Sequence, residues 1–323
     1  MRALICDDYG GIDALRVGEM PDPGPIPGTA MVAVRAAAVN FADVLVVAGE
    51  YQVKPELPFV PGGEFAGVIE SADGLDGFHP GDRVCGFTGF GAMAELAVAY
   101  PGAITSLPDH VPFEAGAAIP VAYGTSYHAL VDRAGLRADE TLLVLGAAGG
   151  VGIAAVQIGK ALGAKVVAAV SSQEKAAAAS EAGADEIVRY DETPLRDGIA
   201  AATSGAGVDV VYDPVGGAAT ELALRSTKWN GRLLVIGFAS GEIPSIPLNL
   251  NLVKGNSVIG VFWGRFNMEE PDRSTANNQA IMDWVADGTL RPLVQKTYPL
   301  EQAVDALRWV AGRKAIGRVV ITP

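Results

Sequence analysis

A glycine-rich turn is the segment whose residue types and spacing point most directly to chemistry. It reads Gly146-Ala147-Ala148-Gly149-Gly150-Val151-Gly152 and follows the short apolar run from Leu142 to Leu145. Glycines permit a sharp turn, close approach of the backbone to a pyrophosphate and tight packing of a helix on a strand. The helix that begins here offers free N–H groups and a positive dipole end to phosphates. We therefore predict a dinucleotide site formed by Gly146, Ala148, Gly149, Gly150, Val151 and Gly152.

The residues after the next apolar run, Val166 to Val170, indicate which dinucleotide binds. An NAD site of this type has Asp or Glu roughly 20 residues past the glycines to hold the ribose 2′-hydroxyl. Ser171 and Ser172 stand there instead, with Lys175 just beyond. Hydroxyls and an ammonium attract a 2′-phosphate, and such charge-assisted contacts contribute about 1.5–3 kcal/mol each. We predict NADPH, held by Ser171 and Lys175. A compatible interpretation is that the serines cap the next helix and that Lys175 is solvated.

Alternating strands and helices in the middle of the chain predict the sheet that would position this turn. Strands are expected at 141–145, 166–170, 186–188, 208–212 and 233–236, and helices at 151–162 and 175–182. Continuous apolar strands are typical of a parallel sheet that is buried on both faces, with helices on each side. A helix or pair of helices, interrupted near Pro120 and Gly124, is expected over residues 115–130.

The two ends of the chain have a different pattern. The first hundred residues predict short strands and turns, with strands at 31–39, 65–69 and 92–98 and a turn at 81–84 that leads into a strand. An amphipathic helix at 302–310 and a strand at 317–321 close the chain. Because this last part resembles the first, we expect one small irregular barrel built from both ends, with the parallel sheet inserted between them.

Composition and charge exclude several classes of protein. The chain has 323 residues, half of them hydrophobic, and a formal net charge of −13, which offers no basic field for nucleic acid. Cys6 and Cys85 stand far apart, so neither a disulfide framework nor a cysteine zinc site is expected. The first residues lack the apolar segment of a signal peptide, and no apolar run is long enough to span a bilayer. We expect a cytoplasmic protein with no membrane partner.

Several ordered motifs together resemble the medium-chain dehydrogenase/reductase superfamily, over essentially the whole chain. Besides the glycine turn they are Val39-Asn40-Phe41-Ala42-Asp43, Gly49-Glu50-Tyr51, 58–68, 81–84, 124–127, 210–217, 231–237 and 317–320. The branch it is most similar to is the zinc-independent NADPH:quinone oxidoreductases related to zeta-crystallin. The resemblance implies an α/β protein with a GroES-like irregular β-barrel catalytic domain, 1–122 and 264–323. It also implies a doubly wound Rossmann cofactor domain, 123–263.

Departures from the alcohol-dehydrogenase branch bear on the metal. That branch holds catalytic zinc with a Cys, a His and a second Cys, and the matching positions here are Asn40, Gly63 and Val121. None of these can supply a thiolate or an imidazole. The three histidines, His79, His110 and His128, have no metal-ligand spacing. We predict no metal site and, without a Lewis acid, no alcohol oxidation.

The resemblance also implies roles for individual residues. Asn40 and Tyr51 should line the substrate cleft, where Tyr51 hydrogen-bonds the acceptor oxygen or donates a proton to it; a structural turn and a half-buried aromatic are the alternatives. The other residues expected near the cofactor are Thr125 (nicotinamide), Tyr190 (adenine ribose), Phe238, Phe262, Trp263 and Arg318. A helix start for Thr125 and core packing for Phe238, Phe262 and Trp263 are the competing interpretations. Asp43 should orient its loop, and Leu45 stands where some relatives have a second tyrosine.

A metal-free site with NADPH suits an acceptor that takes a hydride readily. Quinone reduction is the leading hypothesis, and reduction of enones or enoyl thioesters is the second, although the chain shows no basic cluster for a CoA-type substrate. A non-catalytic NADPH-binding protein, as among lens crystallins, is the third, because a fold does not determine a function. The resemblance further implies a homodimer, for which the uncharged alternating segment 256–262 is a suitable edge strand.

Overall fold

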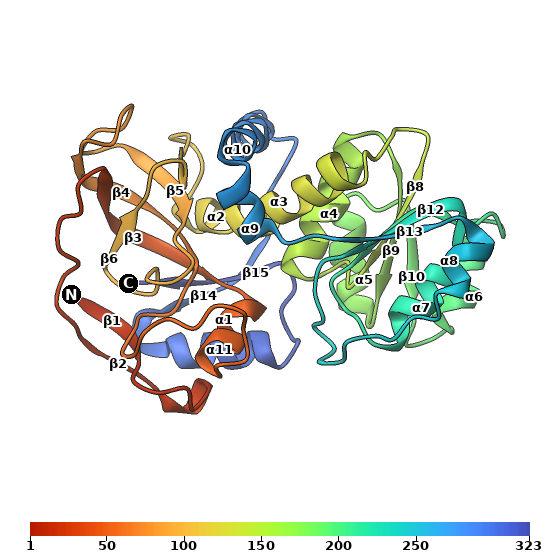
Figure 1. The fold of residues 1–323 in the computed structure, drawn as a ribbon, viewed down its shortest axis with the longest axis horizontal. Helices are drawn as coiled ribbons and strands as arrows, with labels where there is room; N and C mark the ends of the chain where they lie inside the picture. The colour runs from red at the N-terminus through yellow and green to blue at the C-terminus, as the bar shows by residue number, and fades with distance from the viewer. The chain divides into compact units, whose positions relative to one another are not determined.

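Two large sheets of different construction and a small two-stranded one, β1 (Arg2–Cys6) with β2 (Leu15–Glu19), organise the chain, which a computed structural model describes over residues 1–323 (Figure 1). One compact unit, here the barrel unit, comprises Met1–Val121, Asn267–Ala286 and Pro292–Pro323. The other, here the parallel-sheet unit, comprises Ala122–Phe266 and Asp287–Arg291. The first and last parts of the chain thus share one unit. The domain boundaries expected from the sequence stay predictions.

The parallel-sheet unit contains six strands in the order β10-β9-β8-β11-β12-β13, and every neighbouring pair is parallel. They are β8 (Thr141–Leu145), β9 (Lys165–Val170), β10 (Glu186–Arg189), β11 (Val208–Asp213), β12 (Thr227–Val235) and β13 (Ser257–Gly260). The order reverses direction between β8 and β11, as in a doubly wound dinucleotide-binding sheet. This confirms the expected architecture. The strand expected from Leu233 is longer than the sequence indicated, since β12 begins at Thr227.

Helices cover both faces of this sheet (Figure 1). They are α4 (Gly150–Ala161), α5 (Gln173–Glu181), α6 (Leu195–Ala202), α7 (Ala218–Arg225) and α8 (Asn249–Lys254). Leu143 on β8 shares an apolar cluster with Ile199 of α6 and Leu224 of α7. Its neighbour Leu142 points to the opposite face of the sheet and packs against α4. The evidence is that a Cβ placed on Gly159 of α4 would lie only 2.7 Å from the Leu142 side chain. Successive strand residues are therefore buried against different helices, which explains the continuous apolar runs.

Helix α2 (Phe113–Ala117) is separated from α3 (Pro120–Tyr127) just before Pro120, so the expected pair of helices is confirmed. The second expected interruption, near Gly124, is wrong. The helix runs through Gly124 and continues as a π-helical turn from His128 to Arg133. Gly124 serves packing instead, since a Cβ there would lie 2.7 Å from the ring of Trp263.

The barrel unit is built around the long strand β3 (Thr29–Val39). Along one edge it pairs with β4 (Glu64–Asp73). Along the other edge it pairs with β6 (Leu96–Ala99) near its beginning and with β15 (Arg318–Thr322) near its end. The remaining strands are β1 (Arg2–Cys6), β2 (Leu15–Glu19), β5 (Arg83–Phe87), β7 (Ile104–Ser106) and β14 (Val294–Pro299). The two register shifts between β3 and β4 bend the sheet, as expected of an irregular barrel. The strand expected at 92–98 begins only at Leu96.

Helices complete the barrel unit and its core. Helix α11 (Ala303–Ala311) buries Ala306 and Leu307 in the apolar core, which confirms the amphipathic helix expected at the end of the chain. Helix α1 (Phe41–Val47) begins directly after β3 and so fixes the place of Asn40. Helices α9 (Trp263–Glu269) and α10 (Pro271–Ala286) were not expected from the sequence. None of the helices is long and apolar enough to cross a membrane.

Candidate active site

The glycine turn joins β8 to α4 at the carboxyl edge of the parallel sheet. Gly146 has a φ of 58°, a conformation that favours glycine. A Cβ placed on Gly152 would lie 2.3 Å from the Gly146 carbonyl oxygen, so turn and helix pack too closely for a side chain. A Cβ on Gly149 would meet only that oxygen, at 3.5 Å, and the space above the turn is open. This geometry allows a pyrophosphate to approach the backbone.

The first turn of α4 directs N–H groups toward this open space. Ile153 N donates to Gly149 O at 2.8 Å, and the N–H groups of Gly150, Val151 and Gly152 precede that first helical hydrogen bond. The 12-residue helix adds the positive end of its dipole. Backbone donors and dipole together suit a bound phosphate.

Ser171 and Lys175 form a polar pair at the end of β9. Lys175 Nζ donates to Ser171 Oγ at 3.2 Å, so the hydroxyl and the ammonium lie side by side. Ser172 Oγ accepts from Lys175 N at 3.3 Å and caps α5, as the second interpretation predicted. The capping interpretation is therefore confirmed for Ser172, while the binding of a 2′-phosphate by Ser171 and Lys175 stays a prediction. A hydroxyl beside an ammonium, with no carboxylate at this strand end, fits the 2′-phosphate of NADPH.

Three predicted aromatic residues follow other strands of the same sheet. Tyr190 follows β10, Phe238 lies after β12 and Phe262 lies after β13. Because all six strands are parallel, their carboxyl ends lie at one edge, together with the glycine turn. Tyr190 and Phe262 are exposed, at 41% and 50%, so their rings are open to a ligand.

Thr125 and Trp263 lie deeper in the parallel-sheet unit. Both are buried, Thr125 within α3 and Trp263 at the start of α9. The Trp263 ring packs over Gly124 in the space that a Cβ would need. Core packing, one of the competing interpretations for Trp263, is thus observed, and contact of either residue with the cofactor stays a prediction.

Asp213, at the end of β11, is a positioning residue that the sequence did not reveal. Its buried carboxylate accepts from the N–H groups of Val215 and Gly216, each at 2.9 Å, and from Thr220 Oγ1 at 2.5 Å. Val215 in turn lies against the glycine turn, 3.0 Å from where a Cβ of Gly146 would be. Asp213 therefore fixes the loop beside the predicted phosphate site. The sequence signal is an Asp at a strand end before Pro and paired glycines.

The side-chain amide of Asn40, in the barrel unit, is hydrogen-bonded at both its nitrogen and its oxygen. Its Nδ2 donates to Glu64 Oε1 at 2.8 Å, and its Oδ1 accepts from Arg318 Nη1 at 2.9 Å. Arg318 Nη2 also forms an ion pair with Glu64, whose second oxygen accepts from Val121 N at 2.7 Å. All three side chains are buried. These contacts fix which end of the amide is oxygen and leave one Nδ2 hydrogen for another acceptor.

Two further groups in this part of the barrel unit, Asp43 and Tyr51, have raised pKa values. Asp43 Oδ2 accepts from Asn40 N at 2.7 Å at the start of α1, which confirms its expected role in the local loop. Burial raises the pKa of the Asp43 carboxyl to about 7. Burial, and then the charge of Asp43, raise the pKa of Tyr51. The Tyr51 ring packs against the edge of the apolar core, partly buried, as the alternative for it anticipated.

The positions that match zinc ligands in alcohol dehydrogenases have other contacts here. Asn40 is engaged by Glu64 and Arg318, Gly63 has no side chain, and Val121 contributes its backbone N–H to Glu64. A guanidinium 2.9 Å from the amide oxygen would also repel a metal cation placed there. The donor set does not fit zinc.

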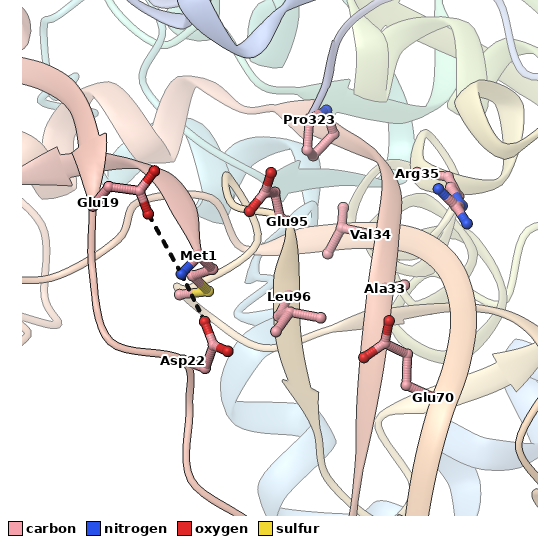
Figure 2. Close-up of a pocket in the computed structure, with 10 residues that line it drawn as sticks. All are labelled: Met1, Glu19, Asp22, Ala33, Val34, Arg35, Glu70, Glu95, Leu96 and Pro323. Carbon is pink, nitrogen blue, oxygen red and sulfur yellow. Dashed lines mark hydrogen bonds and ion pairs between the residues drawn. The ribbon is translucent and has the colours of Figure 1, made fainter.

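A surface cavity of about 540 Å³ lies elsewhere in the barrel unit and contains none of the predicted site residues (Figure 2). Glu19, Asp22, Glu70 and Glu95 line it, and the Met1 amino group bonds Asp22 at 2.6 Å. Its carboxylates would repel a phosphate-bearing cofactor. The glycine turn thus stays the candidate for NADPH.

Comparisons with known proteins agree with this geometry. The family model described as "Alcohol dehydrogenase GroES-like domain" matches residues 26–109, and that described as "Zinc-binding dehydrogenase" matches residues 150–278. "Quinone oxidoreductase-like protein 2" of Mus musculus is 38% identical, over 99% of this chain and 92% of its own length. The "Quinone oxidoreductase" of Homo sapiens is 33% identical, over 99% of this chain and 97% of its own.

The chain belongs to the quinone oxidoreductase branch of the medium-chain dehydrogenase/reductase superfamily. The quinone oxidoreductase of Escherichia coli, solved in complex with NADPH, superposes with a TM-score of 0.92 at 28% identity, and the match covers 100% of each chain. The expected family and fold are therefore confirmed. The family model named for zinc matches residues 150–278, and this range contains none of the positions that match zinc ligands in alcohol dehydrogenases, Asn40, Gly63 and Val121.

The buried ion pair leads to a stability prediction. Replacing Arg318 with Leu leaves the Glu64 carboxylate buried without its cation, and should lower the free energy of unfolding by about 3–5 kcal/mol. Arg308→Leu, which removes exposed ion pairs with Asp13 and Asp305, is the control and should change little. Urea unfolding of both variants measures the difference. Equal stability of the two variants would show that the pair does not organise the site.

Proposed function

We propose that the protein transfers a hydride from NADPH to a quinone without zinc. The observation that supports this most directly is the replacement of zinc ligands by Asn40, Gly63 and Val121, with Asn40 held by Glu64 and Arg318. Relatives named quinone oxidoreductase, and one solved with NADPH, support the acceptor and the cofactor.

The parallel-sheet unit supplies the cofactor site in this proposal. The N–H groups of Gly150, Val151 and Gly152 bind the pyrophosphate, and Ser171 with Lys175 holds the 2′-phosphate. Phe238 and Phe262 flank the bound nucleotide with apolar surface that excludes water. NADPH, when bound, supplies the hydride at its nicotinamide ring.

The barrel unit supplies the groups that meet the acceptor. Asn40 donates its remaining Nδ2 hydrogen to an acceptor oxygen, where negative charge develops as the hydride arrives. Tyr51 donates a proton to the same oxygen. Leu45 in place of a second tyrosine gives an apolar wall, which suits an aromatic quinone.

Steady-state turnover with a panel of acceptors tests the proposed reaction. With NADPH held constant, a naphthoquinone or phenanthrenequinone should give at least about tenfold higher kcat/KM than crotonyl-CoA or simple enones, a difference of 1.4 kcal/mol in barrier. Faster turnover of an enone or enoyl thioester would assign the second hypothesis. Tight NADPH binding with no turnover of any acceptor would assign the non-catalytic one.

The cofactor preference has its own test. Ser171→Asp places a carboxylate beside the 2′-phosphate and should weaken NADPH binding about tenfold or more, with no such loss for NADH. Ser180→Asp adds the same charge at the other end of α5 and is the control. Fluorescence titration of both cofactors gives the dissociation constants. Equal affinity of the wild-type protein for NADPH and NADH would contradict the preference.

We further propose a homodimer joined at β13, in the cytoplasm. Strand β13 is an edge of the sheet, where its outer N–H and C=O groups are available for pairing. Val258 on β13 is exposed, as are Ile243 and Leu248 in the segment before α8 and Leu252 and Val253 on α8. Exposed apolar side chains together with an open strand edge favour a symmetric pairing of two copies. The cytoplasmic assignment follows from two buried, unpaired cysteines, Cys6 and Cys85.

Light scattering tests the dimer. At micromolar concentration the wild-type protein should have the mass of two chains, and Val258→Lys, which places a charge on the edge strand, should shift it to one. Met268→Lys, a change of an exposed apolar residue in the barrel unit, should leave the mass unchanged. A monomeric wild-type protein would refute the dimer.

A further inference from the structure

The buried ionisable groups beside Asn40 would not be electrically neutral if all of them were charged. Asp43 is 5% exposed, Glu64 0% and Arg318 6%, so two carboxyl groups share one guanidinium inside the barrel unit. If both carboxyls were ionised, one negative charge would be buried without a partner. Burial disfavours such a charge strongly, and the usual outcome is that one group takes up a proton.

The contacts decide which carboxyl takes the proton. Burial raises the pKa of Glu64 as well. Glu64, however, receives the guanidinium of Arg318, the amide of Asn40 and the Val121 N–H, all of which stabilise its ionised form. Asp43 receives the backbone N–H groups of Asn40 and Gly63, but no cation bonds it directly. Burial raises the pKa of Asp43 to about 7, and the negative charge of Glu64 adds to that rise.

The other titratable groups around Asp43 do not offset this. Arg318 on β15 lowers the Asp43 pKa through its charge, less than burial raises it. Tyr51, in the segment after α1, responds to the charge of Asp43. Cys85 on β5, near Glu64, stays a neutral thiol because burial raises its pKa to about 12.

We propose that Asp43 is a positioning residue that must hold a proton for fast turnover, and that loss of this proton slows hydride transfer as the solution becomes alkaline. The inference rests on the proposed quinone reduction. It adds a group that touches neither acceptor nor cofactor and acts through Asn40 and Tyr51.

The direction of the effect follows from the charges of the reaction. The quinone gains a hydride from NADPH and becomes an anion, with its negative charge on a carbonyl oxygen. Tyr51 then gives its proton to this oxygen, and solvent returns a proton to Tyr51. The balance is quinone, NADPH and one proton giving hydroquinone and NADP⁺, and the Asp43 proton is not consumed. An ionised Asp43 places negative charge beside the forming anion and raises the pKa of Tyr51, so it opposes both steps.

The pH profile of kcat/KM for a quinone tests the proposal. Wild-type activity should fall by about threefold or more as pH rises through about 7, from a single buried charge. Asp43→Asn keeps an acceptor for the Asn40 N–H but cannot ionise, so its profile should lack this fall. Glu64→Gln removes the charge that raises the Asp43 pKa, so its fall should move to lower pH.

Asp82→Asn is the matched control. The Asp82 carboxylate accepts a backbone N–H three residues earlier, from His79 at 2.7 Å, but it is exposed. Its variant should keep the wild-type profile. The proposal would be overturned if kcat/KM of Asp43→Asn fell with rising pH as in the wild type. It would also be overturned if the fall in Glu64→Gln occurred at the same pH as in the wild type.

Unfolding measured against pH separates this proposal from the proposed function, because it needs no acceptor. A carboxyl with a folded pKa near 7 and an unfolded pKa of about 3.9 contributes stability below the lower value that is lost as pH rises through the higher. Asp43→Asn should therefore gain in melting temperature relative to the wild type between about pH 4 and pH 7. If this gain is observed but the protein turns over no quinone, the proposed function is refuted and the proton on Asp43 is supported. A constant difference across that range would refute the proton on Asp43.

Discussion

The buried ion pair between Glu64 and Arg318 is the interaction on which the candidate site depends. It joins β4, from the first part of the chain, to β15, from the last. The same carboxylate holds the Asn40 amide and the Val121 N–H, while Arg318 N donates to Leu293 O at 2.8 Å. Additional hydrogen bonds to the two partners offset part of the desolvation cost of a buried pair, although the Nε of Arg318 has no partner. Asn40 and Val121, at positions that match zinc ligands in alcohol dehydrogenases, supply two of these hydrogen bonds.

The parallel-sheet unit solves a different problem, which is to gather scattered residues at one edge. Ser171, Tyr190, Asp213, Phe238 and Phe262 are far apart in sequence, but each lies at or just after the end of a strand. Parallel pairing brings all those ends together beside the glycine turn. Asp213 then fixes the adjoining loop through three hydrogen bonds. The predicted phosphate site is thus largely backbone, beside a loop that one buried carboxylate holds.

Much of this could be predicted from sequence because the signals are local. The glycine turn, the apolar strands and the Ser171–Lys175 pair follow from neighbouring residues. The roles of Glu64 and Asp213 could not, since each depends on partners that only the fold brings near. Gly124 suggested a break because a glycine usually weakens a helix, whereas here Trp263 occupies the space of its missing side chain. Helix α10 was missed because few of its residues are buried, so it lacks a clear apolar period.

The central claim is the proposal that hydride transfer in this protein needs no metal, since the positions that match zinc ligands in alcohol dehydrogenases hold Asn40, Gly63 and Val121. The most direct test is an anaerobic single turnover of NADPH with a naphthoquinone, using protein dialysed against a strong chelator. The account predicts the same rate before and after chelation, with no effect of added zinc. A rate that is lost on chelation and restored by zinc would contradict it.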